Sequence, residues 1–431
     1  MINVELSNIW SSVSLPELLG REKALFDAHL RLRANRENEQ PFLGWLGQSD
    51  ALTARTLHAV RKAAEQIRAS GSICVVVGSG GAWLAAQAAL GLLRAYCPGA
   101  GDGQTRLIFA GSDLSAQAWL ALCNRLDGKD FCLHIISSHG DELEPAIASR
   151  AIRWMMERRY GADSKRRIFL STNADSPLAA MAQDGGYTLL PLPTERGGDY
   201  SALTSAVLLP LAVAGYEPLD MLEGAAGAWR EYDLRAFENP VWLYAGARHA
   251  LEARGRQCEA LCTFDPAFSA LLRWWKQLLL RRTCRGGAGL LPMPMELPGE
   301  QDALDAAIGT GKRPVFETML RVNAPAPRRI NVEMDWKDYD GLGYLSGRTL
   351  EEVERAGFEA LCAAQAERDV PIAVLELEQV DAYHLGELFY FLELSSAICA
   401  LADGVDPFAP VTFPAREDAA RALGKTEGTE T

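Results

Sequence analysis

Short apolar runs alternate with longer stretches of helical periodicity through the first half of the chain, and this alternation constrains the fold most strongly. Strand-like runs occur at residues 72–77, 106–110, 131–136, 167–171 and 188–192, with amphipathic helical stretches between them. Strands that alternate with helices predict a doubly wound α/β fold, a mainly parallel sheet with helices on both faces. The alternation restarts near residue 240, so we expect two such αβα domains.

Four segments are therefore expected along the 431 residues. Residues 1–50 form an N-terminal helical segment, 51–232 the first α/β domain, 233–404 the second, and 405–431 a C-terminal helix and tail. Helices at 201–215 and 219–232 close the first domain, and a strand at 240–243 opens the second.

Composition excludes several classes of function. A formal net charge of -13 argues against nucleic acid and membrane surfaces as partners, because both require a basic face. The apolar stretch at 206–216 is interrupted by Pro210 and is too short to span a bilayer. With no signal-like N-terminus, a cytoplasmic protein is expected.

The nine cysteines are scattered, and only Cys258 and Cys262 lie close together in sequence. Their spacing would place both on one face of a helix, but no second Cys or His pair lies nearby. We therefore expect reduced thiols, with neither a metal site nor a cofactor.

Two loops follow predicted strands, at the edge of the sheet where ligands bind in this class of fold. The first runs Gly78-Ser79-Gly80-Gly81 and the second Ser137-Ser138-His139-Gly140, each before a helix, the second expected from residue 146. A helix N-terminus holds phosphate or carboxylate groups well. The candidate ligand-binding residues are Gly80, Gly81, Ala82, Ser137, Ser138, His139, Gly140, Asp141 and Glu142.

The second loop also carries acidic residues, which support a different interpretation. Ser138 and Asp141 have the spacing of a capping box, and Glu142 and Glu144 add negative charge to the same helical turn. A self-capped helix that binds no ligand is therefore as well supported as a phosphate site.

Several longer segments carry a family resemblance. They are Val77-Gly78-Ser79-Gly80-Gly81, Asp127-Gly128-Lys129-Asp130, Glu144-Pro145-Ala146-Ile147-Ala148, Arg196-Gly197-Gly198-Asp199-Tyr200-Ser201, Trp274-Trp275-Lys276-Gln277-Leu278, Phe316-Glu317-Thr318, Gly386-Glu387-Leu388 and Asp406-Pro407-Phe408. With these segments in this order, residues 42–425 resemble the glucose-6-phosphate isomerase family, which is built from two sugar-isomerase (SIS) domains.

The resemblance implies a mechanism. Such enzymes bind a sugar phosphate with a Ser/Thr loop, open the ring with a basic residue, and move a proton between C1 and C2 with a glutamate. The family is usually dimeric, and a histidine reaches the site across the interface. Residues 274–278 and 386–391, similar to segments at that interface, lead us to expect a homodimer.

This sequence departs from the family at most catalytic positions. Ala82 replaces a serine, and four residues of the phosphate loop are replaced by His139, Asp141, Glu142 and Leu143. Asp199 replaces an arginine, and residues 280–284 contain no glutamate. Asp302 replaces the histidine, and Arg416 or Glu417 replaces a lysine. Acids thus stand where the family has bases, and Arg281 and Arg282 stand where it has an acid.

These replacements favour a catalytically degenerate member of the family, a pseudoenzyme acting as a sensor or scaffold. Its empty cleft could be filled by ion pairs such as Asp199–Arg416 or Arg281–Asp302. Two alternatives stay open. One is a pocket adapted to a different small ligand, sugar-derived, cationic or amino-bearing, and the other is residual isomerase activity.

Overall fold

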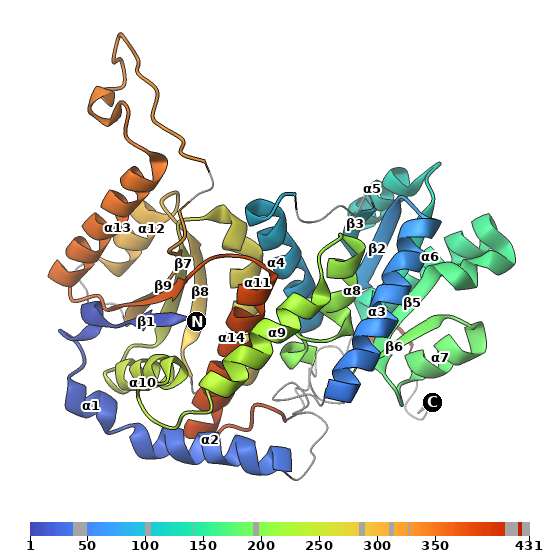
Figure 1. Cartoon of the computed structure of the whole chain (residues 1–431), viewed down its shortest axis with the longest axis horizontal. Helices are drawn as coiled ribbons and strands as arrows, with labels where there is room; N and C mark the ends of the chain where they lie inside the picture. Colours follow the sequence, from blue (N-terminus) through green and yellow to red (C-terminus); the bar gives the residue numbers. More distant parts are fainter. Residues whose placement is uncertain are drawn as a thin grey trace.

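The computed structural model describes residues 1–37, 50–99, 105–140, 142–192, 198–283, 289–309, 314–325, 328–409 and 421–424. Figure 1 shows two lobes, each built around a sheet, with long helices packed between them. Most of the C-terminal helix and tail expected at 405–431 falls outside the described residues.

The first lobe confirms the predicted doubly wound sheet. Five parallel strands lie in the order β3-β2-β4-β5-β6. They are β2 (Ile73–Gly78), β3 (Arg106–Ala110), β4 (Phe131–Ile136), β5 (Ile168–Asn173) and β6 (Thr188–Leu192). The helices are α3 (Asp50–Ser70), α4 (Gly80–Tyr96), α5 (Ala116–Leu126), α6 (Leu143–Tyr160) and α7 (Pro177–Gly185).

Side chains of each strand alternate between the two faces of this sheet, as the pleat requires. Val75 and Val77 pack with α5 and α6, whereas Cys74 and Val76 pack with α3 and α4. Burial on both faces explains why the strands are continuous apolar runs.

In the second lobe, four parallel strands repeat the order of the first four strands of the other sheet, and the antiparallel strand β1 takes the place of the fifth. The lobe contains β7 (Cys258–Thr263), β8 (Leu291–Glu296), β9 (Val315–Val322) and β10 (Ile372–Leu377), in the order β1-β10-β9-β7-β8. Its helices are α10 (Pro240–Ala253), α11 (Ser269–Arg282), α12 (Gln301–Ile308), α13 (Leu350–Glu367) and α14 (Ala382–Ala402).

Three sequence predictions about the elements are wrong. The N-terminal segment is not only helical, because β1 (Asn3–Glu5) pairs antiparallel with β10 before α1 (Leu15–Leu19) and α2 (Glu22–Glu37) begin. The strand expected at 240–243 is the start of α10, because Asn239 caps that helix and Pro240 suits its first position. Cys258 and Cys262 lie on a strand rather than a helix.

The predicted helical hairpin is present as α8 (Ser205–Val213) and α9 (Pro218–Glu231). In Figure 1, α9 lies beside α14 at the centre of the molecule. Two glycines permit this close packing: a Cβ on Gly386 would lie 1.9 Å from the Met221 carbonyl oxygen, and one on Gly224 would lie 1.8 Å from that of Tyr383. Among the described helices, α14 alone is long and apolar enough to cross a membrane, but 94% of its apolar window is buried inside the protein.

The segments 274–278 and 386–391 do not form an exposed interface. Trp274, Trp275 and Leu278 are buried inside this chain, and residues 386–391 are buried in α14. Their apolar character serves the core, so the dimer is not supported by these residues.

A buried polar network explains another retained segment. On β7, the Glu259 carboxylate accepts hydrogen bonds from the Tyr244 and Thr318 hydroxyls, at 2.6 Å each, and from Arg248 Nε at 2.9 Å. The carboxylate and guanidinium are both buried. Removing Arg248 or Glu259 would leave a buried charge unpaired, and the Thr318 hydroxyl supplies one of the hydrogen bonds to that carboxylate.

Candidate active site

The glycine loop lies at the switch point of the first sheet. Gly78 ends β2 and is paired with Ile136, the last residue of β4, so the two predicted loops are neighbours. A Cβ on Gly78 would lie 2.8 Å from the Ile136 carbonyl oxygen, and Gly80 has φ +77°. Both positions therefore require glycine.

The N-terminus of α4 follows directly from this turn. Its N-cap residue, Ser79, makes no side-chain capping hydrogen bond, and the first turn contains no acidic residue. Gly81 and Ala82 are buried, and Ala82 belongs to the hydrophobic core, so it does not offer a ligand contact.

In the second loop, the acidic residue Glu142 hydrogen-bonds with a side chain of the same loop. The Ser137 hydroxyl donates to the Glu142 carboxylate and accepts a hydrogen bond from the Gly140 N–H at 2.9 Å. Ser137 is buried, and its one hydroxyl proton is used within the loop. Glu142 thus accepts the hydrogen bond of the hydroxyl group that, by the family resemblance, would bind the phosphate.

The capping box expected at Ser138 is not formed in the described part of the loop. The N-cap of α6 is Glu142, and the Ser138 carbonyl instead accepts hydrogen bonds from β5, from Asn173 N–H and Thr172 hydroxyl, at 3.1 Å each. His139 is exposed, and Asp141 lies outside the described residues.

Asp199 and Arg281 form an ion pair beside the glycine turn. Asp199, in the short 3-10 helix Gly198–Tyr200, is 1% exposed, and its Oδ1 lies 3.3 Å from Arg281 Nη1 near the end of α11. A Cβ on Gly80 would lie 3.7 Å from the same Nη1 and 3.5 Å from Gln277 Nε2. The structure therefore brings Gly80, Asp199 and Arg281 together, as expected for one site.

The ion pair between Arg281 and Asp302 that the sequence suggested is not formed, because Arg281 pairs with Asp199 instead. Among the described ion pairs, Arg281 joins Asp199 and not Asp302, which is exposed on α12. The two lie on separate helices, and α12 presents Asp302 to solvent rather than to the cleft. Arg416 and Glu417 lie outside the described residues, as does the side chain of Arg282.

Glu393 is a further acid of this site that the sequence analysis missed. It is fully buried on α14, where Oε1 accepts a hydrogen bond from Ala202 N–H at 3.2 Å, and Oε2 has no hydrogen-bond partner among the described residues. Burial, and secondarily the negative charge of Asp199, raises the pKa of Glu393 to about 8. The sequence signal that could have identified Glu393 is a single acidic residue inside the long apolar run 388–401.

Taken together, the described site contains three acids, Glu142, Asp199 and Glu393, and one paired base, Arg281. Because the raised pKa of Glu393 keeps it protonated at neutral pH and Arg281 offsets the charge of Asp199, the net negative charge of these four residues comes from Glu142; a carboxylate about 5 Å from a phosphate charge costs about 3 kcal/mol at an effective dielectric near 20.

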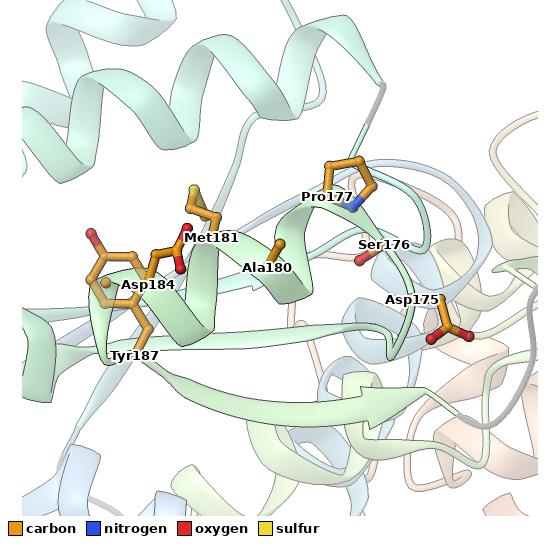
Figure 2. A pocket seen from close by; sticks show the side chains of 8 residues that line it. Asp175, Ser176, Pro177, Ala180, Met181, Asp184 and Tyr187 are labelled. Atoms are coloured by element: carbon orange, nitrogen blue, oxygen red, sulfur yellow. The ribbon is translucent and has the colours of Figure 1, made fainter. Parts of the chain in front are cut away.

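A concavity lies elsewhere in the first lobe. It has a volume of about 820 Å³ beside α7 and is lined by Asp175, Ser176, Pro177, Ala180, Met181, Asp184, Gly185 and Tyr187. Figure 2 shows these side chains along one side of α7. None of the predicted site residues lines it.

Comparison with known proteins identifies the family. No family model matches the chain. A protein named glucose-6-phosphate isomerase from Symbiobacterium thermophilum is 35% identical over 400 residues, covering 91% of this chain and 89% of that protein. Another of the same name, from Bacillus cytotoxicus, is 31% identical over 414 residues, covering 94% and 92%.

Solved structures agree on the fold. A hypothetical protein from Thermus thermophilus superposes with a TM-score of 0.85 at 24% identity, covering 99% of this chain and all of that one. A glucose-6-phosphate isomerase from Chlamydia trachomatis gives a TM-score of 0.80 at 17% identity, covering 98% and 88%. The fold and the sequence relatives lead to one conclusion: the chain belongs to the glucose-6-phosphate isomerase family.

Proposed function

We propose that this chain is a non-catalytic member of its family, a pseudoenzyme that keeps the fold without interconverting glucose 6-phosphate and fructose 6-phosphate. The observation that carries the proposal is the Asp199–Arg281 ion pair beside the Gly80 turn. The resemblance assigns an arginine to the first position and a glutamate to the stretch around the second. Both charges are reversed, and each now neutralises the other.

The chemistry of the family reaction depends on the residues replaced. A glutamate base typically contributes on the order of 10² to 10⁴ in rate, and a cation that stabilises the enediolate a comparable factor. An arginine at 281 is permanently protonated and cannot accept the C2 proton. The replacements therefore remove both the base and the charge stabilisation.

Binding is expected to fail together with catalysis. The Ser137 hydroxyl is held by Glu142, and that carboxylate lies where a phosphate would need donors. A sugar phosphate would have to displace a hydrogen-bonded acid and then lie beside it.

A thermal-shift titration with 6-phosphogluconate, a stable analogue of the family's substrates, tests this proposal. The relative from Symbiobacterium thermophilum is the positive control. The melting temperature of this chain should not move at millimolar concentrations that stabilise the control. A concentration-dependent rise for this chain would show that the phosphate site is intact and would overturn the proposal.

A second candidate function is recognition of a cationic or amino-bearing small ligand by the same site. It is favoured by Glu393, whose buried Oε2 lacks a hydrogen-bond partner among the described residues and which lies near Asp199. An ammonium group would satisfy such an oxygen. Glucosamine should then stabilise the protein more than glucose. Equal shifts for the two sugars would refute this candidate.

The cytoplasm is the compartment we propose for this protein. The described cysteines are free thiols, which suits a reducing environment, and the long apolar helix α14 packs in the core.

A further inference from the structure

The concavity beside α7 is a groove formed by one face of that helix. The residues of this face are spaced by three or four positions, so their side chains lie in one row: Pro177, Ala180, Met181 and Asp184. The volume of about 820 Å³ falls in the range of small-molecule sites, about 300–1,000 Å³. We call this concavity the α7 groove.

Tyr187 lines the groove at the C-terminal end of α7. Gly186 ends the helix in the left-handed conformation, with φ +65°, and Tyr187 N–H donates to the Ala182 carbonyl at 2.8 Å, as in a Schellman motif. A Cβ on Gly185 would lie 2.6 Å from Cζ of the Tyr187 ring, so the ring lies directly against the backbone there. Figure 2 shows Tyr187 at the same end of the groove as the carboxylate of Asp184.

The other end of the groove lies at the N-terminus of α7. The Ser176 hydroxyl accepts a hydrogen bond from Ala179 N–H at 3.1 Å and is bonded to the Thr172 hydroxyl at 2.7 Å, so it serves as the helix cap. Asp175, the residue before this cap, also lines the groove. Asp175 and Asp184 are exposed, and neither forms an ion pair within the part of the chain that the structure describes.

The groove therefore has a carboxylate at each end and an apolar floor between them. Its described lining residues include no lysine, arginine or histidine, so an anionic ligand would find no partner there. At 1.5 Å of rise per residue, Asp175 and Asp184 stand roughly 13 Å apart along the helix. One metal ion cannot join carboxylates so far apart, because its oxygen ligands lie within about 2.6 Å. A matching ligand carries positive charge at both ends and methylene groups between them.

We propose that the α7 groove binds a linear aliphatic polyamine. One terminal ammonium group pairs with Asp184 and lies against the Tyr187 ring, where cation–π attraction adds to the ion pair. The other terminal ammonium group pairs with Asp175. The methylene chain between them covers Ala180 and Met181, and the flexible thioether of Met181 adapts to its shape.

Calorimetric titration of the full chain with spermidine at low ionic strength tests the proposal. Asp175→Asn and Asp184→Asn should each raise the Kd about fivefold, because each removes one exposed ion pair. Met181→Lys places a cation on the floor of the groove and should abolish binding. Glu359→Gln removes the same charge from an exposed site on α13, in the other lobe, and should leave the Kd unchanged. Circular dichroism of each variant checks that the fold is intact.

Hexaamminecobalt(III) separates recognition of the polyamine from attraction of any cation to an acidic protein. This ion carries the same charge as spermidine but is compact and has no methylene chain, so it cannot reach both carboxylates. Spermidine should bind at least tenfold more tightly. Equal affinity for the two cations would overturn the proposal. So would the absence of spermidine binding, or an equal loss of affinity in Asp184→Asn and Glu359→Gln.

Discussion

Arg281 Nη1 lies 3.3 Å from Asp199 Oδ1, and this pair stands where the family resemblance places an arginine and a glutamate. Reversal at one position alone would have left a buried acid or base beside a like charge. Because both are reversed, the two charges still neutralise each other, and we propose that the groups that would act on a sugar phosphate are lost.

Removing the arginine should therefore destabilise the fold. In Arg281→Ala, Asp199 loses its described ion pair while 1% exposed, and we expect the free energy of unfolding to fall by about 2 kcal/mol. Urea unfolding measures this change. Arg273→Ala, an exposed arginine on the same helix, should change it by less than about 0.5 kcal/mol. Equal effects of the two substitutions would contradict the structural role of the pair.

Neutralising Glu142 should open the second loop to anions. Glu142→Gln frees the Ser137 hydroxyl from a charged acceptor and removes a repulsion of about 3 kcal/mol, so 6-phosphogluconate should bind about 100-fold more tightly than to the wild type. Calorimetric titration compares the two, with Glu144→Gln as the control in the same helical turn. The account of the loop fails if Glu142→Gln gains no affinity.

Stability should depend on pH through Glu393. Its pKa is about 8 in the folded protein and near 4.5 when unfolded, so the folded state retains a proton that the unfolded state releases between these values. Stability is full below about pH 4.5 and is lost as the pH rises toward 8, by up to about 1.4 kcal/mol per pH unit. Unfolding midpoints of wild type and Glu393→Gln at pH 5, 6, 7 and 8 should diverge accordingly, the glutamine variant being less sensitive. Parallel curves would show that Glu393 does not titrate in this range.

Gly386→Ala should disrupt the packing of α14 on α9, because its Cβ would lie 1.9 Å from the Met221 carbonyl oxygen. Forcing the helices apart should cost about 3 kcal/mol of stability, whatever the protein concentration. Gly91→Ala in α4 has no atom within 4 Å of the new Cβ and should be neutral or slightly stabilising. Thermal unfolding at two protein concentrations measures the effect of each substitution. If Gly386→Ala weakened dimerisation without lowering the stability of the fold, residues 386–391 would belong to an interface after all.

Much of the fold could be predicted from sequence because its strands are buried on both faces. Continuous runs such as 131–136 match β4 residue for residue. The failures occurred where local signals were ambiguous: Pro240-Val241-Trp242 is apolar enough for a strand, and only the Asn239 cap marks it as a helix. The three-residue β1 strand depends on pairing with β10, more than 360 residues away.

The site was only partly predictable. The charge reversals at 199 and 281 could be read directly, but their pairing depends on how α11 packs beside the glycine turn, which no local pattern reveals. Glu142 was expected only to add negative charge to the first helical turn, and its hydrogen bond with Ser137 depends on the loop geometry. Glu393 was overlooked because the role of a buried acid depends on residues 199–202, far away in sequence.

The central claim is loss of isomerase chemistry, and a coupled assay that detects glucose 6-phosphate formed from fructose 6-phosphate tests it most directly. With the purified full chain at micromolar concentration, we expect no rate above the background without protein. Turnover above about 1 s⁻¹, the low end for common enzymes, would contradict the account.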